Sequence, residues 1–72
     1  MNKQQINYVT CVIGAISLMT GKPCGYVYKK LQTNGIINDY LAKSYEILHT
    51  FSLEYVAKDV INLLKQKGNP LC

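Results

Sequence analysis

The chain has 72 residues, with eight lysines, no arginine, four acidic residues and a formal net charge of +4. This length is that of one small domain, and such a chain buries only about 60% of the surface that its unfolded form exposes. We expect a single domain over residues 1–72, whose small stability is helped by a partner.

The cysteines and the histidine do not predict a metal site. Cys11, Cys24 and Cys72 form no CxxC pair, and His49 is the sole histidine. An odd number of cysteines without an export signal is typical of reduced thiols in the cytoplasm. The apolar run over residues 9–19 is also shorter than the ~20 residues that span a bilayer. We therefore expect a cytoplasmic protein without metal, cofactor or membrane span.

The first predicted element is a helix over residues 3–19, which Gly21 and Pro23 end. Apolar residues recur in it at steps of three and four: Ile6, Val9, Val12, Ile13, Ile16 and Met19. Residues 8–19 carry no charge on any side, although a surface helix normally has a polar face. Either the other helices enclose this helix, or one side of it binds another copy or a partner. For the second case, the self-association residues are Val9, Ile13, Gly14, Ile16 and Ser17.

The middle of the chain predicts two further helices. One begins at Pro23 or Cys24 and runs to Thr33, and the Asn-Gly pair at residues 34–35 is a left-handed stop signal. The next is predicted over residues 38–49, with Asn38 or Asp39 as its N-cap. Its inward residues are expected to be Leu41, Tyr45 and Leu48.

A fourth helix is predicted over residues 52–67. Ser52 is its expected cap, and Glu54 and Lys65 lie at the ends where the helix dipole favours their charges. Its expected apolar stripe is Leu53, Val56, Val60, Leu63 and Leu64, and the NPLC tail after it is expected to be frayed. The chain is therefore predicted to be all-α, a compact bundle of about four short helices.

Residues 45–55, YEILHTFSLEY, hold the histidine and two hydroxyls and are the best candidate for a chemical site. A nucleophile activated by His49 would need a third group to orient the ring. Thr50 and Ser52, however, stand where the fourth helix needs capping hydroxyls, and His49 stands at the end of the third. We therefore interpret this segment as a corner between helices. With no paired carboxylates and no glycine-rich phosphate loop, neither an enzyme nor a small-molecule substrate is expected.

The basic charge raises nucleic-acid binding as the alternative function. Residues 26–46 can be read as helix, turn and helix, with Lys29, Lys30 and Lys43 available to contact DNA. The expected recognition helix nevertheless carries Asp39 and Glu46, which phosphate repels. The chain also lacks arginine, the residue that reads guanine and clamps phosphate best. DNA binding is therefore the less favoured prediction.

One pattern in the second half of the chain is specific. A glycine turn and an aliphatic residue precede a "YL" pair, a Y-x-x-LHT core and an amphipathic helix with an acidic residue. These positions are Gly35, Ile36, Tyr40, Leu41, Tyr45, Leu48, His49, Thr50 and Asp59. The pattern resembles that of a family of short, uncharacterised bacterial proteins, catalogued as a domain of unknown function. Its members are often encoded beside a protein that resembles an ADP-ribosyltransferase, so the resemblance implies an accessory or antitoxin-like partner of a neighbouring gene product.

The sequence favours a non-enzymatic module that acts by protein contact, as a homodimer, as the partner of a neighbouring gene product, or both. Six of the seven aromatic residues are tyrosine, which suits surfaces that are intermittently covered. The candidate binding residues are Tyr40, Tyr45, His49 and Thr50, which form either a docking surface or a structural corner.

Overall fold

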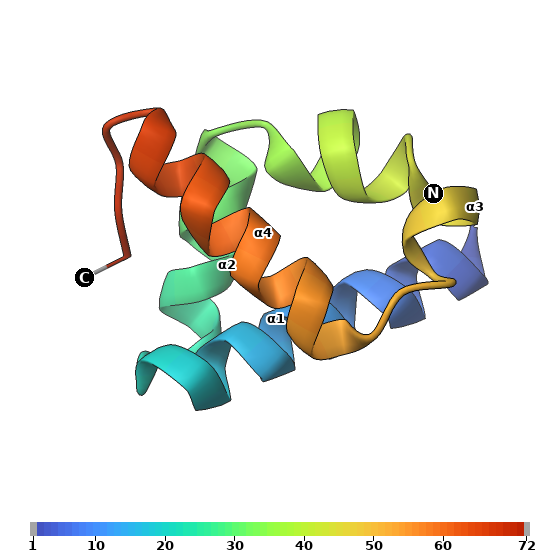
Figure 1. Ribbon diagram of the computed structural model, residues 1–72, viewed down its shortest axis with the longest axis horizontal. Coiled ribbons are helices and arrows are strands. Elements are labelled where there is room, and N and C mark those ends of the chain that lie inside the picture. Colours follow the sequence, from blue (N-terminus) through green and yellow to red (C-terminus); the bar gives the residue numbers. More distant parts are fainter. Residues whose placement is uncertain (1, 72) are drawn as a thin grey trace.

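The computed structural model describes residues 2–71, and helices account for all the regular structure in that range. In chain order these are α1 (Lys3–Thr20), α2 (Cys24–Thr33), the π-helix η1 (Ile37–Ala42), α3 (Tyr45–Leu48) and α4 (Leu53–Gln66). Figure 1 shows α3 and the beginning of α1 at one end of the molecule, and α2 and the end of α4 at the other. The prediction of a compact all-α fold is confirmed.

The limits of α1 follow from local signals at both ends. Asn2 accepts a hydrogen bond from the Gln5 N–H at 2.8 Å, and the Gln5 side chain accepts one from the Asn2 N–H at 3.2 Å. This reciprocal capping box satisfies two N–H groups that the first turn leaves free. Gly21 then ends the helix with φ of 72°, a left-handed conformation that glycine adopts without steric cost.

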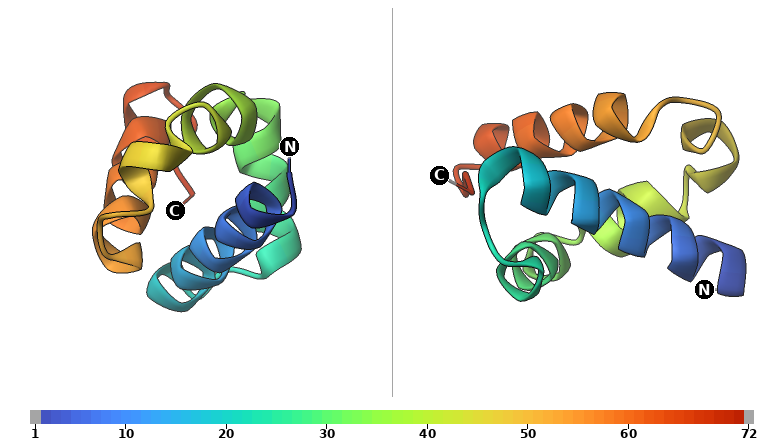
Figure 2. Two further views of the ribbon diagram at one scale, coloured as in Figure 1. Left: turned by 90° about the vertical axis from the view of Figure 1, so that its right-hand side faces the viewer. Right: turned by 90° about the horizontal axis from the view of Figure 1, so that it is seen from below.

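α1 packs against α4, α2 and η1 and is the central helix of the fold (Figure 2). Its stripe of Val9, Val12, Ile13 and Ile16 is buried in the core. The other helices therefore enclose this side of α1. On the remaining side, the Leu18 side chain is 89% exposed.

α2 begins and ends where the sequence predicts. Pro23 is its N-cap, and Val27 and Leu31, one turn apart, are fully buried. Gly35 then takes φ of 74°, and a Cβ built there would lie only 3.0 Å from the Asp39 carboxylate. The positive φ therefore favours glycine at this turn, and a Cβ would also displace the exposed Asp39 carboxylate slightly.

The prediction of one helix over residues 38–49 is wrong. The segment is a π-helix over Ile37–Ala42, a turn at Lys43 and Ser44, and the single turn of α3. Nor is Asn38 or Asp39 its cap, because Ile36 already has helical angles and no side chain caps η1. Ile36 and Ile37 are both buried at the start, and the turn at Lys43 redirects the chain before Leu48 is buried.

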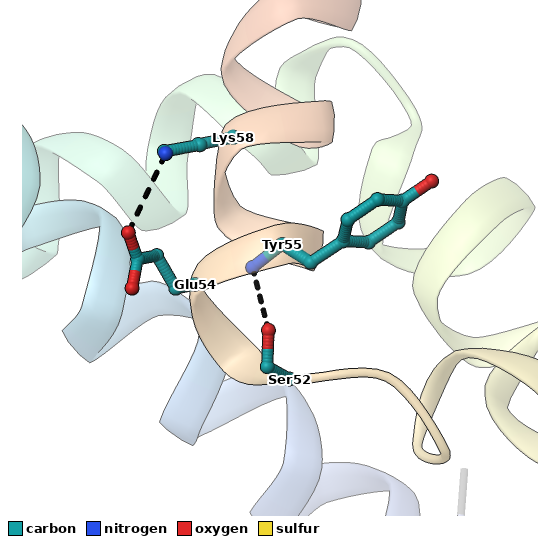
Figure 3. Close-up of polar contacts among 4 residues, drawn as sticks. All are labelled: Ser52, Glu54, Tyr55 and Lys58. Carbon is teal, nitrogen blue, oxygen red and sulfur yellow. Dashed lines mark hydrogen bonds and ion pairs between the residues drawn. The ribbon is translucent and has the colours of Figure 1, made fainter.

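α4 has the clearest two-sided pattern. Ser52 caps it by accepting a hydrogen bond from the Tyr55 N–H at 3.1 Å, and Lys58 pairs with Glu54 at 3.4 Å (Figure 3). The buried residues are Val56, Ala57, Val60 and Leu64. Leu53 was predicted to face inward, but it stands in the first turn and is 40% exposed.

The segment after α4 folds back onto the core. Gly68 turns the chain with φ of 78°, and Leu71 is only 3% exposed. The prediction of a frayed tail is therefore wrong for Leu71, because its side chain completes the apolar cluster. Cys72 lies outside the described residues. Of the helices within residues 2–71, none combines the length and the apolar character needed to cross a membrane.

Candidate protein-contact site

His49 follows the last residue of α3 as its C-cap, and its ring contacts the backbone and a neighbouring ring. Its Nδ1 lies 2.8 Å from the Tyr45 carbonyl oxygen, which can only accept, so Nδ1 carries the proton. The imidazole also stacks on the Tyr45 ring, with centroids 4.9 Å apart and an angle of 19° between the planes. Among residues 2–71, no carboxylate or thiol hydrogen-bonds to this ring. The arrangement is that of a helix end.

Thr50 belongs to the same helix end. Its Oγ1 donates to the Ile47 carbonyl oxygen at 2.6 Å, so it closes α3 and takes no part in capping α4. Ser52 alone supplies the side-chain cap of α4. The structure thus brings Tyr45, His49 and Thr50 together, and the interactions that they make stabilise the corner.

Tyr40 has a different partner. Its hydroxyl donates to the carboxylate of Asp59, which joins η1 to α4. Burial raises the pKa of Tyr40 above its ordinary value, and the hydrogen bond to Asp59 raises it further. The tyrosine is therefore a neutral donor between two helices and is not part of the His49 corner.

Tyr8 of α1 contacts the corner at Tyr45, and the sequence analysis did not single it out. Its ring meets the edge of Tyr45, with centroids 5.3 Å apart and an interplanar angle of 74°. Its hydroxyl is buried without a hydrogen-bond partner among the described residues, and burial raises the pKa of this phenol. Tyr8 precedes Val12 and Ile16 at steps of four, and this spacing could have predicted an inward side chain.

Four large apolar side chains at the corner remain exposed, and we name them the corner patch: Ile47, Phe51, Leu53 and Tyr55. Their exposed fractions are 65%, 45%, 40% and 58%. The Phe51 and Tyr55 rings are 5.1 Å apart, so part of the patch is continuous. Figure 3 shows the Tyr55 ring on the opposite side of α4 from the Glu54–Lys58 pair. The sequence analysis did not propose this patch, although Ile47 lies between positions 45 and 48, which were predicted to face inward.

The residues predicted for self-association lie mostly inside the fold. Val9, Ile13 and Ile16 are buried, and Gly14 and Ser17 are half-buried. Because the chain's own helices cover the first three, a contact between copies through α1 would need the outer side of that helix. Self-association itself stays a prediction.

The helix-turn-helix interpretation and the possible metal ligands can also be compared with the structure. In the helix-turn-helix interpretation, the second helix ends at Ala42, so Lys43 and Glu46 lie outside it. Within residues 2–71, no group of three or more histidine, cysteine or acidic side chains is arranged to hold a metal ion. Cys11 and Cys24 are free thiols on the surface.

The comparisons with known proteins give one result. No curated protein and no solved structure showed significant similarity to the chain. The model of a family described as "protein of unknown function (DUF3791)" matches residues 7–67, which include all the positions of the Y-x-x-LHT pattern. This match extends over most of the chain, and the protein therefore belongs to the DUF3791 family.

Proposed function

We propose that this protein is a non-enzymatic contact module that binds another protein through the corner patch. The observation that carries the proposal is the 40–65% exposure of four large apolar side chains within residues 47–55. Monomeric proteins rarely expose clustered apolar side chains of this size, and aromatic residues are enriched in the centres of protein interfaces.

The rigidity of the corner supports the same function. The side chains of His49, Thr50 and Ser52 each hydrogen-bond to the backbone beside the patch. Tyr45 stacks on His49 and also contacts Tyr8 of α1. A surface that is already ordered loses little conformational entropy on binding, so more of its contact energy appears as affinity. In this proposal, Tyr45, His49 and Thr50 hold the patch in shape and need not contact the partner themselves.

The family resemblance implies the partner to test first, which is the ADP-ribosyltransferase-like protein encoded beside members of this family. The chain would then serve as its accessory or antitoxin-like partner. A homodimer through the same patch is the alternative, and its signature is a concentration-dependent mass for the protein alone.

Titration calorimetry with that neighbouring protein tests the proposal. Phe51→Glu should abolish binding, because it places a charge within the patch, beside the Tyr55 ring. Leu18→Glu is the matched control, since Leu18 is an exposed apolar residue on α1 and is not one of the four patch residues. Both variants should keep the helical circular dichroism spectrum. Unchanged affinity in Phe51→Glu would contradict the proposal, and loss in both variants would show that the effect is not local to the patch.

A further inference from the structure

The charges of the protein are distributed unevenly along its long axis. Five of the eight lysines lie on α2, in the loop before it or at the end of α4, and we name this region the basic end: Lys22, Lys29, Lys30, Lys65 and Lys67. Figure 1 shows α2 and the end of α4 together, opposite α3. One acidic residue, Asp39, lines a hollow there beside Lys67. The remaining three lysines and three acids cancel, so the net charge of the protein resides at the basic end.

Within residues 2–71, no acidic side chain forms an ion pair with these five lysines. Among residues 2–71, the one ion pair joins Lys58 to Glu54, outside the basic end. Like charges gathered on one surface repel each other and lower the stability of the folded state. A ligand with negative charge would remove that repulsion.

A hollow of about 240 Å³ lies between α2 and the segment after α4. The residues that line it are Tyr26, Lys29, Lys30, Thr33, Asn34 and Asn69. The Asn69 side chain donates to the Asn34 side chain at 3.1 Å, and Asn34 in turn donates to the Lys30 carbonyl oxygen at 2.8 Å. A hydrogen bond between two lining residues, 35 positions apart in the sequence, thus joins the end of α2 to the segment after α4.

The walls of the hollow combine charge with apolar surface. The Tyr26 ring is 43% exposed, and its hydroxyl donates to the Leu71 carbonyl oxygen at 3.4 Å. Lys30 is half-buried, so its aliphatic stem lines the hollow while its ammonium group supplies positive charge. This combination accommodates one apolar side chain flanked by carboxylates.

We propose that the basic end binds an acidic segment of a partner protein, in which carboxylates meet Lys29 and Lys30 and an apolar side chain enters the hollow beside Tyr26. Nucleic acid fits the same surface less well. The chain has no arginine, the side chain whose planar fork reads guanine, so this surface lacks the group that specific DNA recognition uses most often. This surface is separate from the corner patch and does not depend on the function proposed for it.

Fluorescence anisotropy with the full chain tests this inference. The probe is a fluorescein-labelled peptide of alternating glutamate and leucine, and its control has glutamine in place of glutamate. The wild-type protein should bind the acidic peptide and not the control. The double variant Lys29→Glu/Lys30→Glu should bind at least about tenfold more weakly, because two attractive contacts become repulsive.

The matched variant is Lys3→Glu/Lys43→Glu, which changes the net charge equally at the other end of the molecule. Its affinity for the acidic peptide should stay within about twofold of wild type. Equal losses in the two double variants would overturn the proposal, since net charge alone would then explain binding. Absence of wild-type binding at low salt would also overturn it.

One further variant and one further ligand complete the experiment. Lys29→Glu alone changes an exposed side chain and should weaken binding about threefold, which tests the proposal even if the double variant unfolds. A labelled DNA duplex is titrated in parallel. Tighter binding to the duplex than to the peptide, with an affinity that falls steeply as salt rises, would overturn the proposal. The ligand of the basic end would then be nucleic acid and not an acidic protein segment.

Discussion

Tyr40 and Asp59 join the π-helix to the C-terminal helix by a hydrogen bond between side chains 19 residues apart in the sequence. Both side chains are half-buried, and the carboxylate accepts from a phenol that burial keeps neutral. This interaction holds η1 in place, since no side chain caps η1 at its own N-terminus.

Replacement of Tyr40 by phenylalanine removes the hydroxyl that donates a hydrogen bond to the Asp59 carboxylate. We expect the free energy of unfolding to fall by about 1 kcal/mol, as for loss of a partly exposed hydrogen bond to a charged group. Urea denaturation measures the change. Tyr55→Phe is the control, because Tyr55 is 58% exposed, and it should leave stability unchanged. Equal stability of Tyr40→Phe and wild type would show that the hydrogen bond does not hold η1.

The same tyrosine predicts a dependence of stability on alkaline pH. Its folded-state pKa lies above the ordinary value of 10.0, so the folded chain holds the phenolic proton more tightly than the unfolded chain. The stabilisation is fully present below about pH 10 and is lost as pH rises from there through the folded-state pKa. Urea denaturation between about pH 8 and about pH 11 should show a steeper loss in wild type than in Tyr40→Phe. Parallel curves for the two proteins would contradict this cause, because Tyr40 is the one titratable side chain in which they differ.

A side chain at Gly35 should lower the stability of the fold. Gly35→Ala places a Cβ on a residue with φ of 74° and 3.0 Å from the Asp39 carboxylate. We expect a loss of about 1 kcal/mol in stability, measured by thermal unfolding. Gly25→Ala is the matched control, since Gly25 lies in the first turn of α2 with no atom within 4 Å of a built Cβ. That change should be neutral or slightly stabilising. Destabilisation of both variants by the same amount would rule out the turn geometry as the cause.

Leu71 should contribute to the core despite its position after the last helix. Leu71→Ala removes a side chain that is 3% exposed, and we expect about 2 kcal/mol of destabilisation. Leu18→Ala makes the same chemical change at a side chain that is 89% exposed and should alter stability by less than about 0.5 kcal/mol. Similar denaturation midpoints for the two variants would mean that the tail does not pack in solution.

The limits of α1, α2 and α4 could be predicted because residues close in sequence determine them. Ser52 hydrogen-bonds three positions onward to begin α4, and Gly35 supplies the left-handed turn after α2. Local signals did not predict that the third helix, expected over residues 38–49, would be divided into η1, a turn and α3. Ile37 and Leu41 have a spacing that both an α-helix and a π-helix bury, so periodicity alone did not distinguish them.

The candidate site depended more on tertiary contacts. Tyr45, His49 and Thr50 were recognised as one corner because their interactions are local. Tyr40 was grouped with them, although its partner is on α4. A helix without charge on any side does not indicate which side its neighbours cover, so the sequence left Val9, Ile13 and Ile16 open between enclosure and self-association. The structure buries these three side chains in the core.

The central position of α1 also affects the order in which the fold is completed during translation. The ribosome synthesises α1 first, whereas α4, against which it packs, begins only at Leu53. The stripe of Val9, Val12, Ile13 and Ile16 therefore stays uncovered until most of the chain has been made. Nascent chains that stop before α4 should expose this stripe and be substrates for chaperones or proteases, so premature termination should leave little soluble fragment.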